Sequence, residues 1–173
     1  MANYVAQGIS RKRIRAFTKY IREVCGLQDT VFFPVVEFFE LALPKLVDGF
    51  TYDIVEYSEM PDKEGETIPS LNIIKIRDDV YEKALQGDGR ARFTILHEVG
   101  HLLLHDNDRV ALCRKSDNAS LKTYEDPEWQ ADAFAGELLM AEHLVKDMSP
   151  LEIEICCGAS HAAAECQYKQ IRR

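Results

Sequence analysis

Apolar residues repeat with helical spacing near the start of the 173-residue chain. Between residues 11 and 25 they form one stripe, made of Ile14, Phe17, Ile21 and Val24. This spacing predicts an amphipathic helix. The other faces of that helix carry the cations Arg11, Lys12, Arg13, Arg15, Lys19 and Arg22. We interpret these cations as a solvated face, and the alternative is a docking surface for an acidic partner or for DNA.

A helix and two strands are predicted to follow. Pro34 suits a first helical turn, and the helix is expected to run to about Leu43, where Pro44 ends or kinks it. Residues 51–57 and 71–77 are rich in β-branched and aromatic residues and predict strands.

Two less regular stretches accompany these elements. The charged stretch 61–69 contains glycine and proline and predicts a loop, and residues 79–86 predict a short helix. Residues 106–123 are polar and irregular, which leaves room for a flap over a site. The chain therefore combines helices with a small sheet.

The run from Arg92 to His105 is helical in pattern and apolar nearly all round, which predicts a buried helix. Histidine and glutamate side chains on such a helix need partners, because burying an unpaired polar or charged group is costly. The run contains an HExxH motif at residues 97–101. The neutral alternative is a pair of surface histidines flanking a glutamate in a salt bridge.

The spacing of the motif suits a metal ion. His97 and His101 are four residues apart, so on a helix they share a face and can converge on one Zn²⁺. Glu98 is placed to reach a metal-bound water rather than to be an equal ligand. His105 lies about 12 Å from His97 along a straight helix axis, too far for both to bind one ion. His105 is therefore predicted to be a helix-end or second-layer residue.

The third ligand is sought downstream. Residues 126–140 begin with Asp126 and Pro127, which suit a helix N-terminus. Glu128 and Asp132 share one face of this helix, four residues apart. We predict that Glu128 binds the metal and that Asp132 accepts the distal N–H of a ligating histidine. The alternative is an ordinary acidic helix start that interacts with the macrodipole.

Two blocks of the chain resemble the ImmA/IrrE family of metallo-endopeptidases. The first is RFTxxHExGH at residues 92–101, and the second is ExQADxFAxxLLM at residues 128–140. The strong resemblance covers residues 71–141, and it departs from the family at Ala141, where proline is usual.

The resemblance implies a zincin-like core with the metal held by His97, His101 and Glu128, and with Glu98 as the general base. It further implies a strand edge beside the motif helix that holds the substrate backbone by β-addition. The expected protein is a cytoplasmic regulatory protease. Its expected partner is a helix-turn-helix repressor encoded nearby, in stress response or on a mobile element.

This ligand set implies a mechanism. Zn²⁺, with Mn²⁺ as an alternative, lowers the pKa of bound water, and Glu98 takes its proton during attack on a peptide carbonyl. A donor for the developing oxyanion is also required. Tyr124, Arg92 and His143 are within sequence reach, and the sequence does not choose among them.

Composition narrows the class of protein. The net charge of −8 does not favour general binding to nucleic acid or to an anionic membrane. No apolar run approaches the ~20 residues of a membrane span, and no signal peptide is evident, so we expect a cytoplasmic protein. The cysteines are Cys25, Cys113, Cys156, Cys157 and Cys166, an odd number that is expected to be mostly reduced. Cys157, His161 and Cys166 are a weaker alternative for a second metal site.

The C-terminal segment predicts two short helices. Ser149 and Glu152 fit a capping box around Pro150, Gly158 ends the first helix, and Ser160 can begin the second. The pair resembles a helix-turn-helix, but its few cations do not favour direct DNA binding. We therefore divide the chain into a metallopeptidase domain at residues 1–148 and a helical appendage at residues 149–173.

The sequence as a whole predicts an α+β fold that is zincin-like, with a helix-rich single domain and a small sheet beside the HExxH helix. The predicted function is a zinc-dependent metallo-endopeptidase acting on one protein substrate. The alternative is a zincin-fold regulator, or a toxin–antitoxin component, that acts by binding a partner without cleavage.

Overall fold

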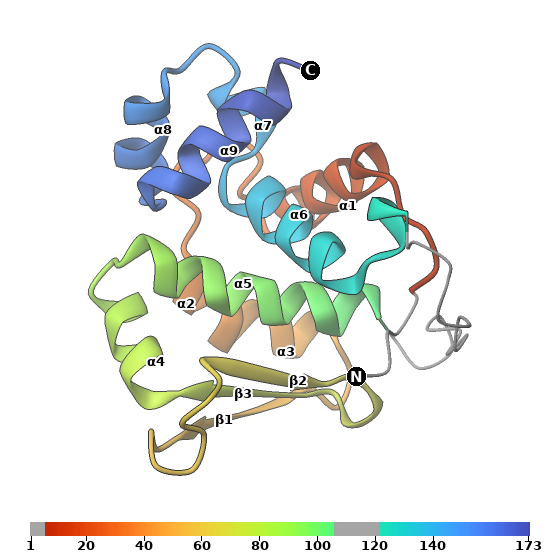
Figure 1. Ribbon diagram of the computed structural model, residues 1–173, viewed down its shortest axis with the longest axis vertical. Coiled ribbons are helices and arrows are strands. Elements are labelled where there is room, and N and C mark those ends of the chain that lie inside the picture. Colours follow the sequence, from red (N-terminus) through yellow and green to blue (C-terminus); the bar gives the residue numbers. More distant parts are fainter. Residues whose placement is uncertain (1–5, 106–121) are drawn as a thin grey trace.

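The computed structural model describes residues 6–105 and 122–173 and shows a helix-rich α+β fold, as predicted (Figure 1). Most of the proposed flap at 106–123 lies outside the described residues. The helices are α1 (Arg11–Val24), α2 (Val35–Glu37), α3 (Leu43–Leu46), α4 (Asp78–Leu85), α5 (Gly89–Leu104), α6 (Pro127–Leu139), α7 (Glu142–Val145), α8 (Pro150–Cys157) and α9 (His161–Ile171). Between them lie a π-helical turn, η1 (Phe38–Ala42), and the 3₁₀ turns η2 (Pro69–Leu71) and η3 (Thr123–Glu125).

The sheet is mixed and small. Its strands are β1 (Thr51–Val55), β2 (Gly65–Ile68) and β3 (Ile73–Arg77), in the order β1-β3-β2. β3 lies in the centre, parallel to β1 and antiparallel to β2. The stretch 61–69, predicted to be a loop, therefore contains an edge strand. That strand has only four residues, all half-buried, so it lacks the alternation that marks a longer strand.

Helix α5 lies at the centre of the fold. Figure 1 shows the sheet on one side of α5, and α6 and α1 on the other. Ile95, Leu96 and Val99 of α5 are wholly buried, which confirms the prediction of a buried helix. The helix begins at Asp88, whose side chain accepts a hydrogen bond from the backbone N–H of Ala91.

Helices α5 and α6 approach closely at two small residues. A Cβ atom added to Gly100 would lie 3.1 Å from the Cα and 3.2 Å from the carbonyl oxygen of Ala131. It would also lie 3.2 Å from the Phe134 ring. A side chain at position 100 would therefore fit only if its neighbours on α6 moved by a few tenths of an ångström. Gly100 belongs to the HExxH motif, so this contact brings the motif against α6.

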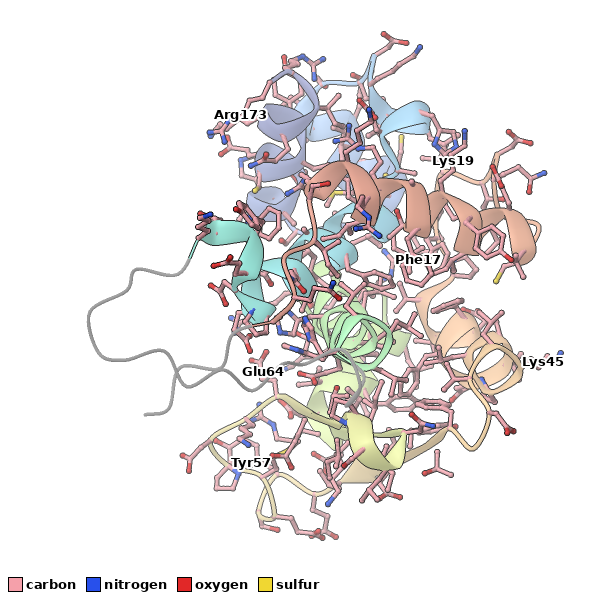
Figure 2. The ribbon with its side chains drawn as sticks, turned by 90° about the vertical axis from the view of Figure 1, so that its right-hand side faces the viewer. Phe17, Lys19, Lys45, Tyr57, Glu64 and Arg173 are labelled. Carbon is pink, nitrogen blue, oxygen red and sulfur yellow. The ribbon has the colours of Figure 1, made fainter. Side chains whose placement is uncertain are left out.

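Helix α1 covers the outer side of α6. The rings of Phe17 and Phe134 are 6.1 Å apart, and Figure 2 shows Phe17 and Lys19 on opposite sides of α1. Arg22, predicted to be on the solvated face, is instead wholly buried. Its guanidinium donates to the carbonyls of Leu138 and Leu139 at the C-terminal end of α6, and to those of Leu27 and Thr30 in the loop that follows α1. Burial lowers the pKa of Arg22 to about 10.

The helical segment after Pro34 does not end at Pro44. The backbone N–H of Leu43 bonds the carbonyl of Phe38, five residues earlier, and α3 continues to Leu46. Proline has no N–H to donate, so it is tolerated in the first turn of a helical segment. The wide π-helical turn before Pro44 lets the chain enter that new segment without a break.

The two C-terminal helices begin as predicted. Ser149 and Glu152 form a capping box at α8, Gly158 ends α8 with φ of 59°, and the Ser160 side chain begins α9. Ile153 and Ala164 are wholly buried in the same hydrophobic cluster as α5. The division at residue 148 stays a prediction.

We expect Gly100→Ala to lower the free energy of unfolding by about 1–2 kcal/mol, because its methyl group would press against the backbone of α6. The matched control is Gly136→Ala. A Cβ there meets side-chain atoms no closer than 3.5 Å, so this change is expected to be neutral or to stabilise by up to about 1 kcal/mol. Urea unfolding of both variants measures the difference. Equal changes in the free energy of unfolding of the two variants would show that the α5–α6 contact can accommodate a methyl group at position 100.

Candidate metal centre

The structure brings the three predicted ligands together. The Nε2 atoms of His97 and His101 on α5 are 3.0 Å apart. The carboxylate of Glu128, in the first turn of α6, places its oxygens 3.2 Å from His97 Nε2 and 3.4 Å from His101 Nε2. All three ligand atoms lie within 4.8 Å of one another. The geometry therefore fits a single cation.

The chemistry of these donors fits a divalent metal. Two imidazoles and one carboxylate form a His₂Glu set, which in catalytic zinc sites leaves one position for water or substrate. The side chain of Glu128 is 70% exposed, so this face of the group opens to solvent. The ligand assignment itself stays a prediction.

Asp132 lies beside His97, one of the predicted ligands. Its Oδ1 atom is 2.8 Å from His97 Nδ1, one turn of α6 beyond Glu128. The carboxylate can only accept, so His97 carries a proton on Nδ1 and turns Nε2 towards Glu128. Burial disfavours the charged ring, but the hydrogen bonds with Asp132 and Glu128 outweigh it and raise the pKa of His97 to about 9. The contacts of Glu128 with the His101 and His97 rings lower the pKa of its carboxyl group.

His105 is not part of the ligand group. It follows the last residue of α5, and its Nδ1 atom lies 3.0 Å from Nδ1 of His101, on the side away from Glu128. Its Nε2 atom lies 2.9 Å from Oε1 of Gln130. Burial lowers the pKa of His105 to about 4. Sequence reasoning missed Gln130, because nothing local relates a buried glutamine to a histidine 25 positions away.

Glu98 lies on another side of α5, against the edge strand. It is 8% exposed, and its Oε2 atom is 2.6 Å from the hydroxyl of Thr67 on β2. The same hydroxyl lies 2.9 Å from the Glu98 carbonyl oxygen. A Cβ added to Gly65 would lie 2.7 Å from Cγ of Glu98. Strand β2 thus holds this carboxylate closely, and sequence reasoning missed both partners because they lie in the stretch predicted to be a loop.

The three candidate oxyanion donors have different surroundings. Arg92 is 2% exposed, and its guanidinium bonds the carbonyls of Cys157, Gly158 and Phe33, so it cannot reach a substrate. His143 bonds the carbonyl of Gln28 and lines a cavity against α1. Tyr124 is 42% exposed just before α6. The exposed Tyr124 therefore remains as the candidate oxyanion donor.

The alternative second metal site has no support in the part of the chain that is described. There, His97, His101 and Glu128 are the only three histidine, cysteine or acidic residues whose ligand atoms converge. Cys157 is wholly buried, and burial raises the pKa of its thiol to about 11. His161 instead pairs with Glu154, at 2.8 Å.

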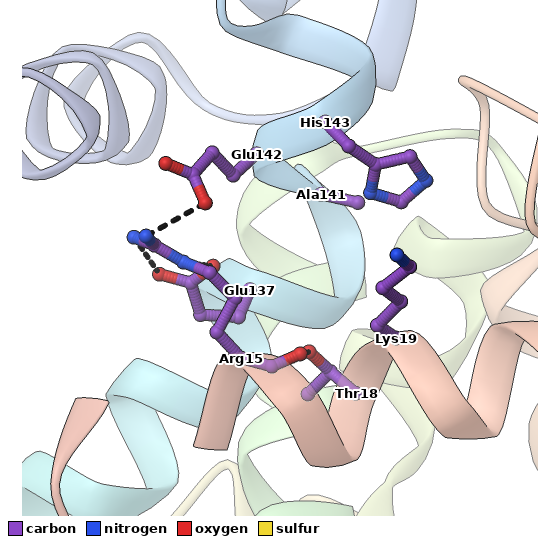
Figure 3. Close-up of a pocket in the computed structure, with 7 residues that line it drawn as sticks. All are labelled: Arg15, Thr18, Lys19, Glu137, Ala141, Glu142 and His143. Atoms are coloured by element: carbon purple, nitrogen blue, oxygen red, sulfur yellow. Dashed lines mark hydrogen bonds and ion pairs between the residues drawn. The ribbon is translucent and has the colours of Figure 1, made fainter. Parts of the chain in front are cut away.

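A cavity of about 130 Å³ between α1, α6 and α7 is lined by several charged side chains, and those of Arg15, Glu137 and Glu142 are paired (Figure 3). Arg15 contacts Glu137 at 2.9 Å and Glu142 at 2.7 Å, and Arg11 contacts Glu137 at 2.8 Å. The side chain of Glu137 is wholly buried. The prediction of a solvated basic face is therefore wrong for Arg11, Arg15 and Arg22, which make internal contacts.

Comparison with known proteins identifies one family. The model of a peptidase family described as IrrE N-terminal-like domain matches residues 59–155, more than half of the chain. The match includes strand β2, the three predicted ligands and Asp132. A search of curated proteins finds no match. Within residues 6–105 and 122–173, no helix has both the length and the apolar character needed to cross a membrane.

We expect His101→Ala and Glu128→Gln to abolish stoichiometric zinc binding, because each removes one of three ligands. Asp132→Asn should retain the ion with about 10–100-fold weaker affinity. Elemental analysis and chelator competition on metal-stripped, reconstituted protein measure both quantities. Glu142→Gln is the matched control, since it also neutralises an acid in the first turn of a helix. Full zinc occupancy in His101→Ala would contradict the assignment.

Proposed function

Because the chain belongs to the peptidase family described as the IrrE N-terminal-like domain, we propose that it is a zinc-dependent endopeptidase. We further propose that its substrate is one protein, a helix-turn-helix transcriptional repressor. The convergence of His97, His101 and Glu128, with Glu98 adjacent in sequence to the first of them, carries the proposal. His₂Glu with an adjacent glutamate is the donor set of a metal-assisted hydrolase.

Each residue of the site has a separate role in the proposed peptide hydrolysis. A zinc ion held by the three ligands would supply Lewis-acid chemistry and make water a stronger acid. Glu98 accepts the proton of the attacking water at its carboxylate and then delivers it to the leaving amine. Asp132 keeps the His97 ring oriented through the 2.8 Å contact at Nδ1. Tyr124 is the donor we propose for the developing oxyanion.

Thr67 and Gly65 position the base in this proposal. The Thr67 hydroxyl is 2.6 Å from the Glu98 carboxylate, and Gly65 leaves just enough space for the Glu98 side chain. Both belong to the edge strand β2. A substrate segment added to the outer edge of β2 would therefore lie beside Glu98, in an extended conformation.

The repressor is proposed from the family resemblance and is consistent with the charge of the chain. The net charge of −8 favours a basic partner, and DNA-binding proteins are commonly basic. A regulator that only binds its partner has no physical need for a carboxylate held as closely as that of Glu98. Assays of cleavage and of binding therefore distinguish an endopeptidase from a regulator that only binds its partner.

We expect the protein to cleave the helix-turn-helix protein encoded in the adjacent reading frame when supplied with Zn²⁺ or Mn²⁺. Glu98→Gln should slow cleavage by about 10²–10⁴-fold while keeping the metal, because the amide cannot accept the proton. Gel electrophoresis and mass spectrometry of the products measure cleavage. Undiminished cleavage by Glu98→Gln would remove it as the base. Tight binding without cleavage by the natural sequence would instead favour the non-catalytic regulator.

We expect Thr67→Val to lower kcat by about 10–100-fold with KM and zinc content unchanged, because the base loses a hydrogen bond to a charged group. Thr67→Ser should restore most of the rate. The matched control is Thr18→Val on α1, a buried threonine whose hydroxyl bonds the carbonyl of Arg15. Steady-state kinetics measure the effect. A rise in KM alone would show that Thr67 binds substrate rather than positioning the base.

A further inference from the structure

A chain of hydrogen bonds leads from the far side of His101 into the protein interior. His101 Nδ1 lies 3.0 Å from His105 Nδ1, and His105 Nε2 lies 2.9 Å from Gln130 Oε1. Gln130 Nε2 then lies 2.9 Å from the carbonyl oxygen of Gln7 and 2.8 Å from that of Tyr124. This series of hydrogen bonds thus joins the end of α5, helix α6, the turn η3 and the N-terminal segment.

The orientation of the Gln130 amide follows from its partners. Gln130 is 0% exposed, and the carbonyls of Gln7 and Tyr124 can only accept hydrogen bonds. The amide NH₂ group must therefore face these two carbonyls, because the reversed amide would place its Oε1 atom against two carbonyl oxygens that cannot donate. Consequently the Oε1 atom of Gln130, which only accepts, faces His105.

The tautomer of His105 follows in turn. Because Gln130 Oε1 accepts, His105 must carry a proton on Nε2. His105 is 5% exposed, and its two partners are a neutral amide and another ring, so no carboxylate in these bonds offsets a positive charge. The ring is therefore neutral, and its Nδ1 atom has a free lone pair.

This lone pair decides the state of His101. A hydrogen bond between the two Nδ1 atoms now requires His101 to be the donor, with its proton on Nδ1. In the neutral His101 ring the Nε2 atom is then unprotonated, and it lies 3.0 Å from His97 Nε2 and 3.4 Å from Glu128. This is the tautomer that a metal ion needs.

We propose that Gln130 and His105 are positioning residues that select the metal-binding tautomer of His101. The Nδ1 proton of His97 is held by a 61% exposed carboxylate, that of Asp132, whereas the Nδ1 proton of His101 is held by the buried pair of His105 and Gln130, here called the relay. The role in zinc binding rests on the proposed function, but the tautomers themselves do not.

The outer end of the relay ties the metal site to the start of the chain. The backbone N–H of Ala6 bonds the carbonyl of Glu125, and that of Ile9 bonds the carbonyl of Tyr124. These bonds hold the N-terminal segment against η3, where the Gln7 carbonyl meets Gln130. Docking of this segment therefore contributes to the state of His101.

Long-range ¹H–¹⁵N NMR of the histidine rings tests the tautomers in the metal-free protein, at a pH about two units above the ordinary histidine pKa. We expect the ring proton of His101 on Nδ1 and that of His105 on Nε2. A proton on Nε2 of His101, or on Nδ1 of His105, would overturn the proposal. This measurement uses the natural sequence, so it does not depend on whether any variant folds.

Chelator competition tests the consequence for zinc. Gln130→Met keeps the approximate size of the side chain but removes both ends of the amide, and we expect zinc affinity to fall about 10–100-fold. Gln167→Met is the matched control. Gln167 is also buried, with its amide between Arg11 and the carbonyl of Met140. Equal zinc affinity in the two variants would overturn the relay.

The two readouts distinguish this proposal from the proposed function. If the natural protein has the expected tautomers but cleaves no peptide, the relay stands and the endopeptidase proposal fails. If it cleaves its substrate while Gln130→Met keeps full zinc affinity and the His101 tautomer, the relay fails and the endopeptidase stands.

Discussion

The close contact between Gly100 and Ala131 is the constraint on which the rest of the structure depends. A glycine at the crossing of α5 and α6 lets the two backbones meet without an intervening side chain. The first turn of α6 then lies beside the histidines of α5, and Glu128 reaches both Nε2 atoms. A larger residue at this point would separate two of the predicted ligands from the third.

Two buried arginines near this crossing donate hydrogen bonds to backbone carbonyls at helix ends. Arg22 and Arg92 are both buried, and both donate to carbonyls at helix C-termini, those of α6 and α8 respectively. A buried guanidinium is costly to desolvate, but its several donors can satisfy carbonyls that a helix end leaves unpaired. Each arginine thereby fastens one helix to the loop that contains Thr30 and Phe33.

Each functional side chain is supported in a different way. His97 is oriented by the carboxylate of Asp132, His101 by the buried ring of His105, and Glu98 by the hydroxyl of Thr67. These supports come from α6, from the end of α5 and from the edge strand. Orientation by rigid neighbours matters because metal binding and proton transfer both require a defined ring nitrogen or carboxylate oxygen.

Helical periodicity relates residues four positions apart, so the sequence by itself determined the buried α5 helix and the shared helix faces of His97 with His101 and of Glu128 with Asp132. The tertiary structure decided what has no local period. Strand β2 is too short to show alternation, Gln130 reaches His105 across 25 positions, and Arg22 looks like a surface cation until its carbonyl partners are in place. Such contacts join residues far apart in the chain, and only the packing of α5 against α6 and the sheet brings them together.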